Sequence, residues 1–212
     1  GRVGEINRAA AVLAREVAGP EGHVLGSLGP TGAFLEPYGD ETEDAFFEAF
    51  AGQGEALEAG GADAAIVETM TAIEECCVAV RALRARTNLT VIASFTFDPQ
   101  AGGGYASMMG VRPAQIAEAA LAAGAHVIGA NCGLGPEHMV RVVRELRAAV
   151  PGVPLAAMPN AGMPVLENGR TVFKETPEAM AAKGLELRAA GATLIGGCCG
   201  TGPEHIAALV KA

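Results

Sequence analysis

The sequence has 212 residues, half of them apolar but only 4% aromatic, and its formal net charge is −9. This composition predicts one globular domain whose core is mostly Ala, Val, Leu and Ile, and the acidic balance argues against partners such as nucleic acid or a membrane surface. No apolar run approaches the about 20 residues of a membrane span. Four of the five cysteines form two adjacent pairs, which argues against a disulfide framework and favours the reducing cytoplasm.

Short apolar runs alternate along the chain with longer stretches that have helical spacing. The chain enters directly into a helical pattern over Arg2–Ala18. The runs predicted to be strands are His23–Ser27, Ala64–Glu68, Val91–Phe97, His126–Asn131, Pro154–Met158 and Thr193–Gly197. Prolines stand where four of the intervening helices should begin, at Pro113, Pro136, Pro177 and Pro203. Alternation of strands and helices predicts a parallel sheet with helical crossovers.

An internal repeat sharpens this prediction. The segment from Gly124 to His138 aligns without a gap with the segment from Gly191 to His205, and a weaker copy runs from Gly61 to Glu68. Each copy reads as a glycine at a helix end, a buried strand, and then a polar or thiol residue at the carboxyl end of the strand. Active sites of (β/α) barrels lie at that end. A doubly wound open sheet would also bind ligands there, but no strand is followed by a dinucleotide fingerprint, so the barrel is favoured.

Three cysteines fall at these strand ends. Cys132 follows one strand, and the adjacent pair Cys198 and Cys199 follows the strand two places later. Thiolates are soft ligands that suit zinc, and a catalytic zinc commonly has three protein ligands. The alternatives are cysteines that serve as small apolar residues, and a strained redox pair between Cys198 and Cys199. Cys76 and Cys77 lie within an apolar helical pattern and are interpreted as packing residues.

A zinc ion held by three thiolates is a poor Lewis acid for making hydroxide, because the sulfurs offset its charge. The fourth position could instead bind a substrate thiol and stabilise it as a thiolate. The pattern therefore predicts a sulfur nucleophile that accepts an alkyl group.

The same residues resemble the homocysteine S-methyltransferase family over essentially the whole chain. The motifs are Asn131-Cys-Gly-Leu-Gly-Pro-Glu137, Pro159-Asn-Ala-Gly-Met-Pro164 and Gly196-Gly-Cys-Cys-Gly-Thr-Gly-Pro-Glu-His205, supported by Gly29-Pro-Thr-Gly32, Glu68-Thr-Met70 and Ser94-Phe-Thr-Phe-Asp98. The motif that begins at Pro159 is similar to that of the branch of cobalamin-dependent methionine synthases.

The resemblance implies a (β/α)8 TIM-type barrel with zinc on Cys132, Cys198 and Cys199. It also implies that Glu68 helps to hold the amino group of homocysteine, that Asn131 lines the same pocket, and that Asn160 completes the zinc shell when substrate is absent. The methyl donor would be a corrinoid, methylcobalamin, carried by a partner domain or protein. The product would be methionine.

The family's first strand carries an Asp-Gly-Ala-type turn, and its second ends near Thr-Asn-Thr-Phe. Neither motif occurs here, so residues 1–212 are expected to form a single barrel domain with about six of eight units, strands three to eight. Two alternative functions stay open. One is the same methylation with a sulfonium donor such as S-methylmethionine, and the other is a catalytically silent zinc-binding barrel fragment.

Smaller features have two interpretations each. His138 and His205 are either partners of the metal ligands or residues at exposed helix starts, and the second is favoured. His126 is expected to be a satisfied core residue. Gly102-Gly-Gly104 is expected to be a flexible loop, because no Lys-Ser/Thr pair follows it as in a phosphate-binding loop.

Overall fold

The computed structural model describes residues 1–133 and 135–212; Leu134, which belongs to the repeat motif, lies outside the described residues. The chain divides into two compact units, Gly1–Ala93 with Ala119–His126, and Ser94–Glu118 with Val127–Ala212. The helices of the described residues are all too short or too polar to span a bilayer.

All six predicted strands are present, with ends shifted by a few residues. They are β1 (Leu25–Leu28), β2 (Ala64–Met70), β3 (Thr90–Phe95), β6 (Val127–Cys132), β7 (Leu155–Pro159) and β10 (Leu194–Ile195). The hydrogen-bonded order is β1-β2-β3-β6-β7-β10, and β1 with β2, β6 with β7, and β7 with β10 are parallel pairs. The α/β class is confirmed, and the succession of parallel strands and helices is consistent with part of a (β/α) barrel.

Helices follow the strands as the sequence predicts. They are α1 (Val3–Ala18), α2 (Glu43–Ala59), α3 (Ile73–Arg86), α4 (Pro113–Ala123), α5 (Pro136–Ala149), α6 (Pro177–Ala189) and α7 (Pro203–Lys211). The four prolines each occupy the first position of a helix, where the missing N–H leaves no carbonyl unpaired. Thr42 and Thr176 cap α2 and α6, because each hydroxyl accepts an N–H of the first turn.

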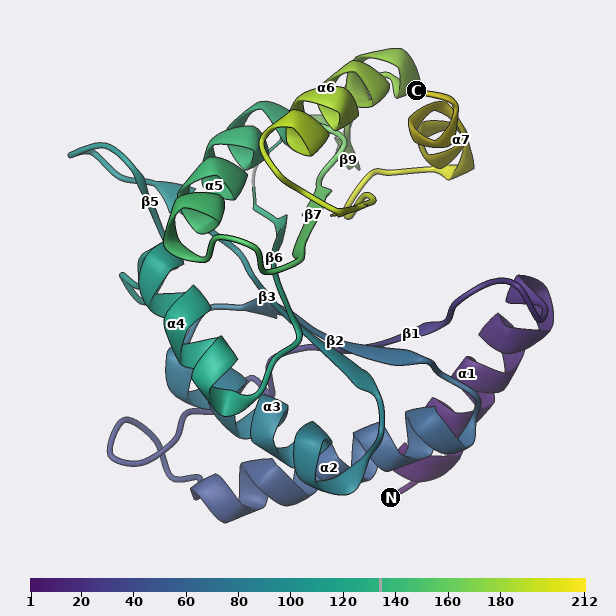
Figure 1. Cartoon of the computed structure of the whole chain (residues 1–212), viewed down its shortest axis with the longest axis vertical. Helices are drawn as coiled ribbons and strands as arrows, with labels where there is room; N and C mark the ends of the chain where they lie inside the picture. The colour runs from purple at the N-terminus through teal and green to yellow at the C-terminus, as the bar shows by residue number, and fades with distance from the viewer. Residues whose placement is uncertain (134) are drawn as a thin grey trace. The chain divides into compact units, whose positions relative to one another are not determined.

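In the first unit, α2 and α3 pack on β1 and β2, and α1 packs on α2 (Figure 1). Several large apolar residues of α1 are nevertheless exposed, namely Ile6, Leu13 and Val17. In the second unit, α5 packs on β6 and β7 and borders α6, which contacts α7 (Figure 1). The apolar residues that give α5 its helical pattern are all buried, namely Met139, Val142, Val143 and Leu146, and Pro136 and Val140 are buried as well.

Two short hairpins add to the expected elements. The segment Gly102-Gly-Gly104 is a loop, as predicted, and it connects β4 (Asp98–Pro99) to β5 (Tyr105–Ala106) in a hairpin. The second hairpin joins β8 (Val165–Glu167) to β9 (Arg170–Val172) through Asn168 and Gly169, whose φ angles are 49° and 76°. An Asn-Gly turn between two β-prone runs is the sequence signal that could have predicted it.

The internal repeat is also a repeat of backbone geometry. Gly61, Gly124 and Gly191 have φ angles of 97°, 108° and 110°, a region that glycine enters without steric cost. Arg15 donates hydrogen bonds of 3.1 and 2.9 Å to the carbonyl oxygen of Gly61. Arg147 donates one of 2.9 Å to that of Gly191. In two of the three copies of the repeat, an arginine side chain therefore stabilises the turn between helix and strand through hydrogen bonds to the glycine carbonyl oxygen.

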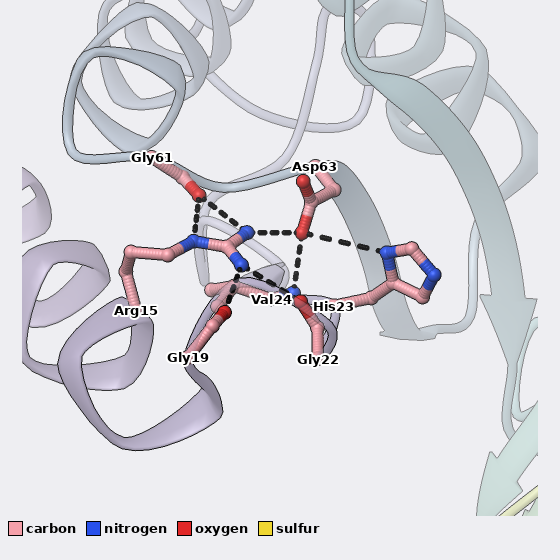
Figure 2. A network of polar contacts seen from close by, with 7 residues as sticks. All are labelled: Arg15, Gly19, Gly22, His23, Val24, Gly61 and Asp63. Atoms are coloured by element: carbon pink, nitrogen blue, oxygen red, sulfur yellow. Dashed lines mark hydrogen bonds and ion pairs between the residues drawn. The ribbon is translucent and has the colours of Figure 1, made fainter.

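The residue two places after each of these glycines accepts an N–H from the neighbouring strand. The pairs are Asp63 with Val24, His126 with Val91 and Thr193 with Leu155, at 2.7, 2.9 and 3.2 Å. Figure 2 shows the first, where Asp63 also forms an ion pair with Arg15. The Val24 N–H and the Arg15 guanidinium hold the pKa of Asp63 below its ordinary value. His126 is therefore satisfied as predicted, but it is exposed and not in the core, because this position lies at the start of its strand.

Candidate metal centre

Three sulfur atoms converge in the second unit. Cys132 is the last residue of β6, whereas Cys198 and Cys199 lie in the turn between β10 and α7. The Sγ of Cys199 lies 3.8 Å from that of Cys132 and 3.9 Å from that of Cys198, and all three lie within 4.8 Å of one another. We call this group the cysteine cluster. All five cysteines are free thiols in the structure.

The spacing of the cysteine cluster fits a tetrahedral zinc site. A Zn–S bond of about 2.3 Å places tetrahedral sulfurs about 3.8 Å apart, close to the two shorter separations here. Cys132 and Cys198 are half-buried and Cys199 is exposed, so these residues are not simply small apolar side chains of the core. The donor set is soft and leaves a fourth position for another ligand.

The backbone at the cysteine cluster has unusual φ angles, which set the directions of the thiol side chains. Cys132 has φ 59°, a left-handed conformation that is uncommon outside glycine, and Thr69 at the equivalent repeat position has the same value. The predicted strand Thr193–Gly197 is paired only over Leu194–Ile195, so the chain turns before the cysteine pair. Gly200 has φ 78°, and a Cβ there would lie 2.2 Å from a ring atom of Phe173. Glycine is thus required directly after the pair.

Asn160 connects the two loops that carry the cysteines. Its Oδ1 accepts the backbone N–H of Cys199 at 3.0 Å, and its Nδ2 donates to the carbonyl oxygen of Gly133 at 3.2 Å. The N–H of Cys198 donates to the carbonyl oxygen of Pro159 at 2.8 Å. Asn160 is 3% exposed, so these bonds are shielded from water.

A second asparagine reaches a cysteine sulfur directly. Asn131 Nδ2 donates to the Sγ of Cys198 at 3.9 Å, and the hydroxyl of Ser94 donates to Asn131 Oδ1 at 2.7 Å. Ser94 and Asn131 are both fully buried. Ser94 belongs to the motif Ser94-Phe-Thr-Phe-Asp98, from which no role for it was predicted. A lone polar residue within the buried run of β3 is the signal that could have identified it.

Burial and mutual repulsion keep the thiols of Cys198 and Cys199 protonated in the metal-free cysteine cluster. Burial, with the nearby Cys132 and Cys199, raises the pKa of Cys198 to about 11, and the Asn131 hydrogen bond opposes this rise. Burial and the hydrogen bond with Cys132 also raise the pKa of Cys199. Converging thiols resist ionisation without a positive charge, because each thiolate repels the next, and a divalent cation would reverse this balance.

The other predicted site residues, Glu68, His138 and His205, have hydrogen-bond partners outside the cysteine cluster. Glu68, at the carboxyl end of β2 in the first unit, accepts a hydrogen bond from the Ser27 hydroxyl. His205 begins α7 but is buried, so the predicted exposed position is wrong: its ring accepts the N–H of Gly202 and contacts the carbonyl oxygen of Glu175. His138 is half-buried and hydrogen-bonded to the hydroxyl of Tyr105 at 2.9 Å.

Comparison with known proteins gives a consistent result. Residues 1–212 match the family described as Homocysteine S-methyltransferase. The chain is 33% identical over 222 residues to the methionine synthase of Mycobacterium tuberculosis (strain ATCC 25618 / H37Rv), and 31% identical over 217 residues to that of Mycobacterium leprae (strain TN). Each alignment covers 97% of this chain but only 18% of the relative, so the chain spans less than a fifth of their length.

A solved structure is similar over nearly the same range. The apo form of the homocysteine methyltransferase MmuM from Escherichia coli has a TM-score of 0.71 and 26% sequence identity, over 96% of this chain and 68% of that one. Its metallated form has a TM-score of 0.68 over 96% of this chain and 66% of that one.

Proposed function

The chain belongs to the homocysteine S-methyltransferase family, and we propose that it is the zinc-dependent, homocysteine-binding part of a methyltransferase that makes methionine. The observation that carries this proposal is the cysteine cluster, whose sulfur separations of 3.8 and 3.9 Å match those of a tetrahedral zinc site. The metallated form of the similar enzyme MmuM supports the assignment of a metal.

Cys132, Cys198 and Cys199 would hold the zinc ion as thiolates. When bound, zinc would supply a positive charge that lets the thiol of homocysteine exist as a thiolate, and therefore as a nucleophile, near neutral pH. The chain's part is to keep the three sulfurs in place. Asn160 does this for the loops at Cys199 and Gly133 through the hydrogen bonds described above.

We further propose that Glu68 helps to bind the amino group of the substrate. It lies at the carboxyl end of its strand, where the repeat also sets Asn131 and Cys198, and its hydrogen bond from Ser27 fixes one carboxylate oxygen. Asn131 and Asn160 would line the pocket beside the sulfurs. Asn160 Oδ1 accepts the N–H of Cys199 through one lone pair, and the second lone pair would be the one that completes the zinc shell.

For the methyl donor we propose a methylated corrinoid presented by a partner domain or protein. Support comes from the methionine synthases, to which this chain is 31–33% identical while it covers 18% of their length. A sulfonium donor such as S-methylmethionine is the second candidate, because the structural similarity to MmuM extends over 96% of the chain.

A methyl-transfer assay tests the proposal. Zinc-loaded protein is given homocysteine with either methylcobalamin or S-methylmethionine, and methionine is measured; Cys199→Ala is the inactive control. We expect methionine from methylcobalamin. Methionine from the sulfonium alone would assign the second donor, and none from either donor would favour the silent zinc-binding fragment.

Binding of the substrate can be measured separately by calorimetry in buffers of different ionisation enthalpy. We expect homocysteine to release one proton when its sulfur joins the metal, and homoserine to bind far more weakly because oxygen is a harder ligand. Equal affinity for the two would argue against coordination through sulfur.

A further inference from the structure

A line of three polar groups runs through the interior of the second unit and ends on a cluster sulfur. The Ser94 hydroxyl on β3 donates to Oδ1 of Asn131 on β6, and Asn131 Nδ2 donates to the Sγ of Cys198. Ser94 is 0% exposed and Asn131 is 1% exposed. Buried polar groups are normally held by such bonds, and here the last acceptor is an expected metal ligand.

The chemistry of these groups fixes the direction of the line. A thiolate can only accept a hydrogen bond, so the amide of Asn131 must turn its NH2 group and not its oxygen toward Cys198. The Ser94 hydroxyl then faces the amide oxygen and must donate to it. Ser94 thereby selects one of the two orientations that an asparagine amide can adopt.

The neighbouring backbone leaves room for this arrangement. A Cβ added at Gly129 of β6 would lie 3.4 Å from the Ser94 Oγ and 2.9 Å from the carbonyl oxygen of Ala156. Because Gly129 has no side chain, β6 can lie close to Ser94. The Ser94 hydroxyl therefore stays within hydrogen-bond distance of the Asn131 amide.

We propose that Ser94 and Asn131 are positioning residues that direct one amide N–H onto the Cys198 sulfur and so limit the negative charge that this ligand donates to the metal. The inference rests on the proposed zinc site. A hydrogen bond withdraws electron density from a thiolate, so the metal keeps more positive charge for the substrate sulfur in its fourth position. Partners of this kind tune metal sites without touching the metal.

Cobalt(II) in place of zinc makes the effect visible, because its sulfur-to-metal charge-transfer absorption reports the energy of the sulfur electrons. The variant Asn131→Leu removes the N–H while keeping the same branched arrangement of side-chain heavy atoms, and it should move this band to lower energy. Ser94→Ala leaves the amide in place without the hydrogen bond from Ser94 and should move the band in the same direction by a smaller amount. Chelator competition should show metal affinity about 10- to 100-fold weaker for Asn131→Leu.

Ser107→Ala is the matched control, because Ser107 is also a buried serine of the second unit, and its hydroxyl accepts a backbone N–H from Val111. The sulfur-to-cobalt charge-transfer band of Ser107→Ala should have the same energy as that of the parent protein. Unshifted bands in both Asn131→Leu and Ser94→Ala would overturn the inference while leaving the metal site intact. Absence of a cobalt spectrum in the parent chain would overturn the metal site and the inference together. If Asn131→Leu fails to fold, the band of Ser94→Ala alone decides the result.

Discussion

Replacing Asn160 by alanine should damage the cysteine cluster without removing any sulfur. The buried side chain makes two part-buried hydrogen bonds, one from the Cys199 N–H and one to the Gly133 carbonyl oxygen. Each such hydrogen bond contributes about 0.5–1.5 kcal/mol net, so losing both should lower the free energy of unfolding by about 1–3 kcal/mol. Because both bonds hold loops that bear cluster cysteines, zinc affinity should also fall about 10- to 100-fold.

The measurement has two parts. Urea denaturation of metal-free parent and variant gives the change in the free energy of unfolding from the midpoint and slope. Competition with a chromogenic chelator gives the zinc affinity of each.

Asn7→Ala is the matched control. Asn7 of α1 also makes two side-chain hydrogen bonds, to the Val3 carbonyl oxygen and from Gln53, but it is only half-buried. Water can replace its partners, so its loss should cost no more than about 1 kcal/mol and leave zinc affinity unchanged. The reasoning fails if Asn160→Ala is no more destabilising than Asn7→Ala and binds zinc as tightly as the parent.

Three further changes have definite expected outcomes. Replacing any one residue of the cysteine cluster by alanine should abolish zinc binding, whereas Cys76→Ala should keep its zinc. If metal analysis finds zinc in all three cluster variants, the proposed zinc site is wrong. Desolvation of its ring and the charge of Arg84 lower the pKa of His126 in the fold, so its contribution to stability is present above about pH 6.5 and lost as the pH falls below that value. His126→Thr, the residue type of the equivalent repeat position, should flatten this acid limb in denaturation curves, and an unchanged limb would contradict the assignment. Gly200→Ala should destabilise the fold by more than about 1–2 kcal/mol, because it adds a clash with Phe173 to the left-handed strain, and a thermal midpoint equal to that of the parent would argue against this geometry.

The sequence alone was sufficient to predict the six main strands, the helices between them and the three cysteines of the cluster, but not the two short hairpins. Alternation of apolar runs and helical patterns predicted all six main strands, and proline at the start of four helices located those helices. The repeat predicted that Cys132 and the pair at Cys198 and Cys199 would meet, because parallel strands present their carboxyl ends at one edge. These are local or periodic properties, which depend on residue type and spacing.

The tertiary structure decided the contacts between residues far apart in sequence. Nothing in the pattern of β3 indicates that Ser94 meets Asn131, or that Asn160 joins the loops at Gly133 and Cys199, since such bonds depend on the register of neighbouring strands. The burial of His205 likewise follows from its contact with Glu175, thirty residues away. Helical spacing predicted α1 but not that several of its large apolar residues are exposed, because periodicity specifies a face and only packing specifies what covers it.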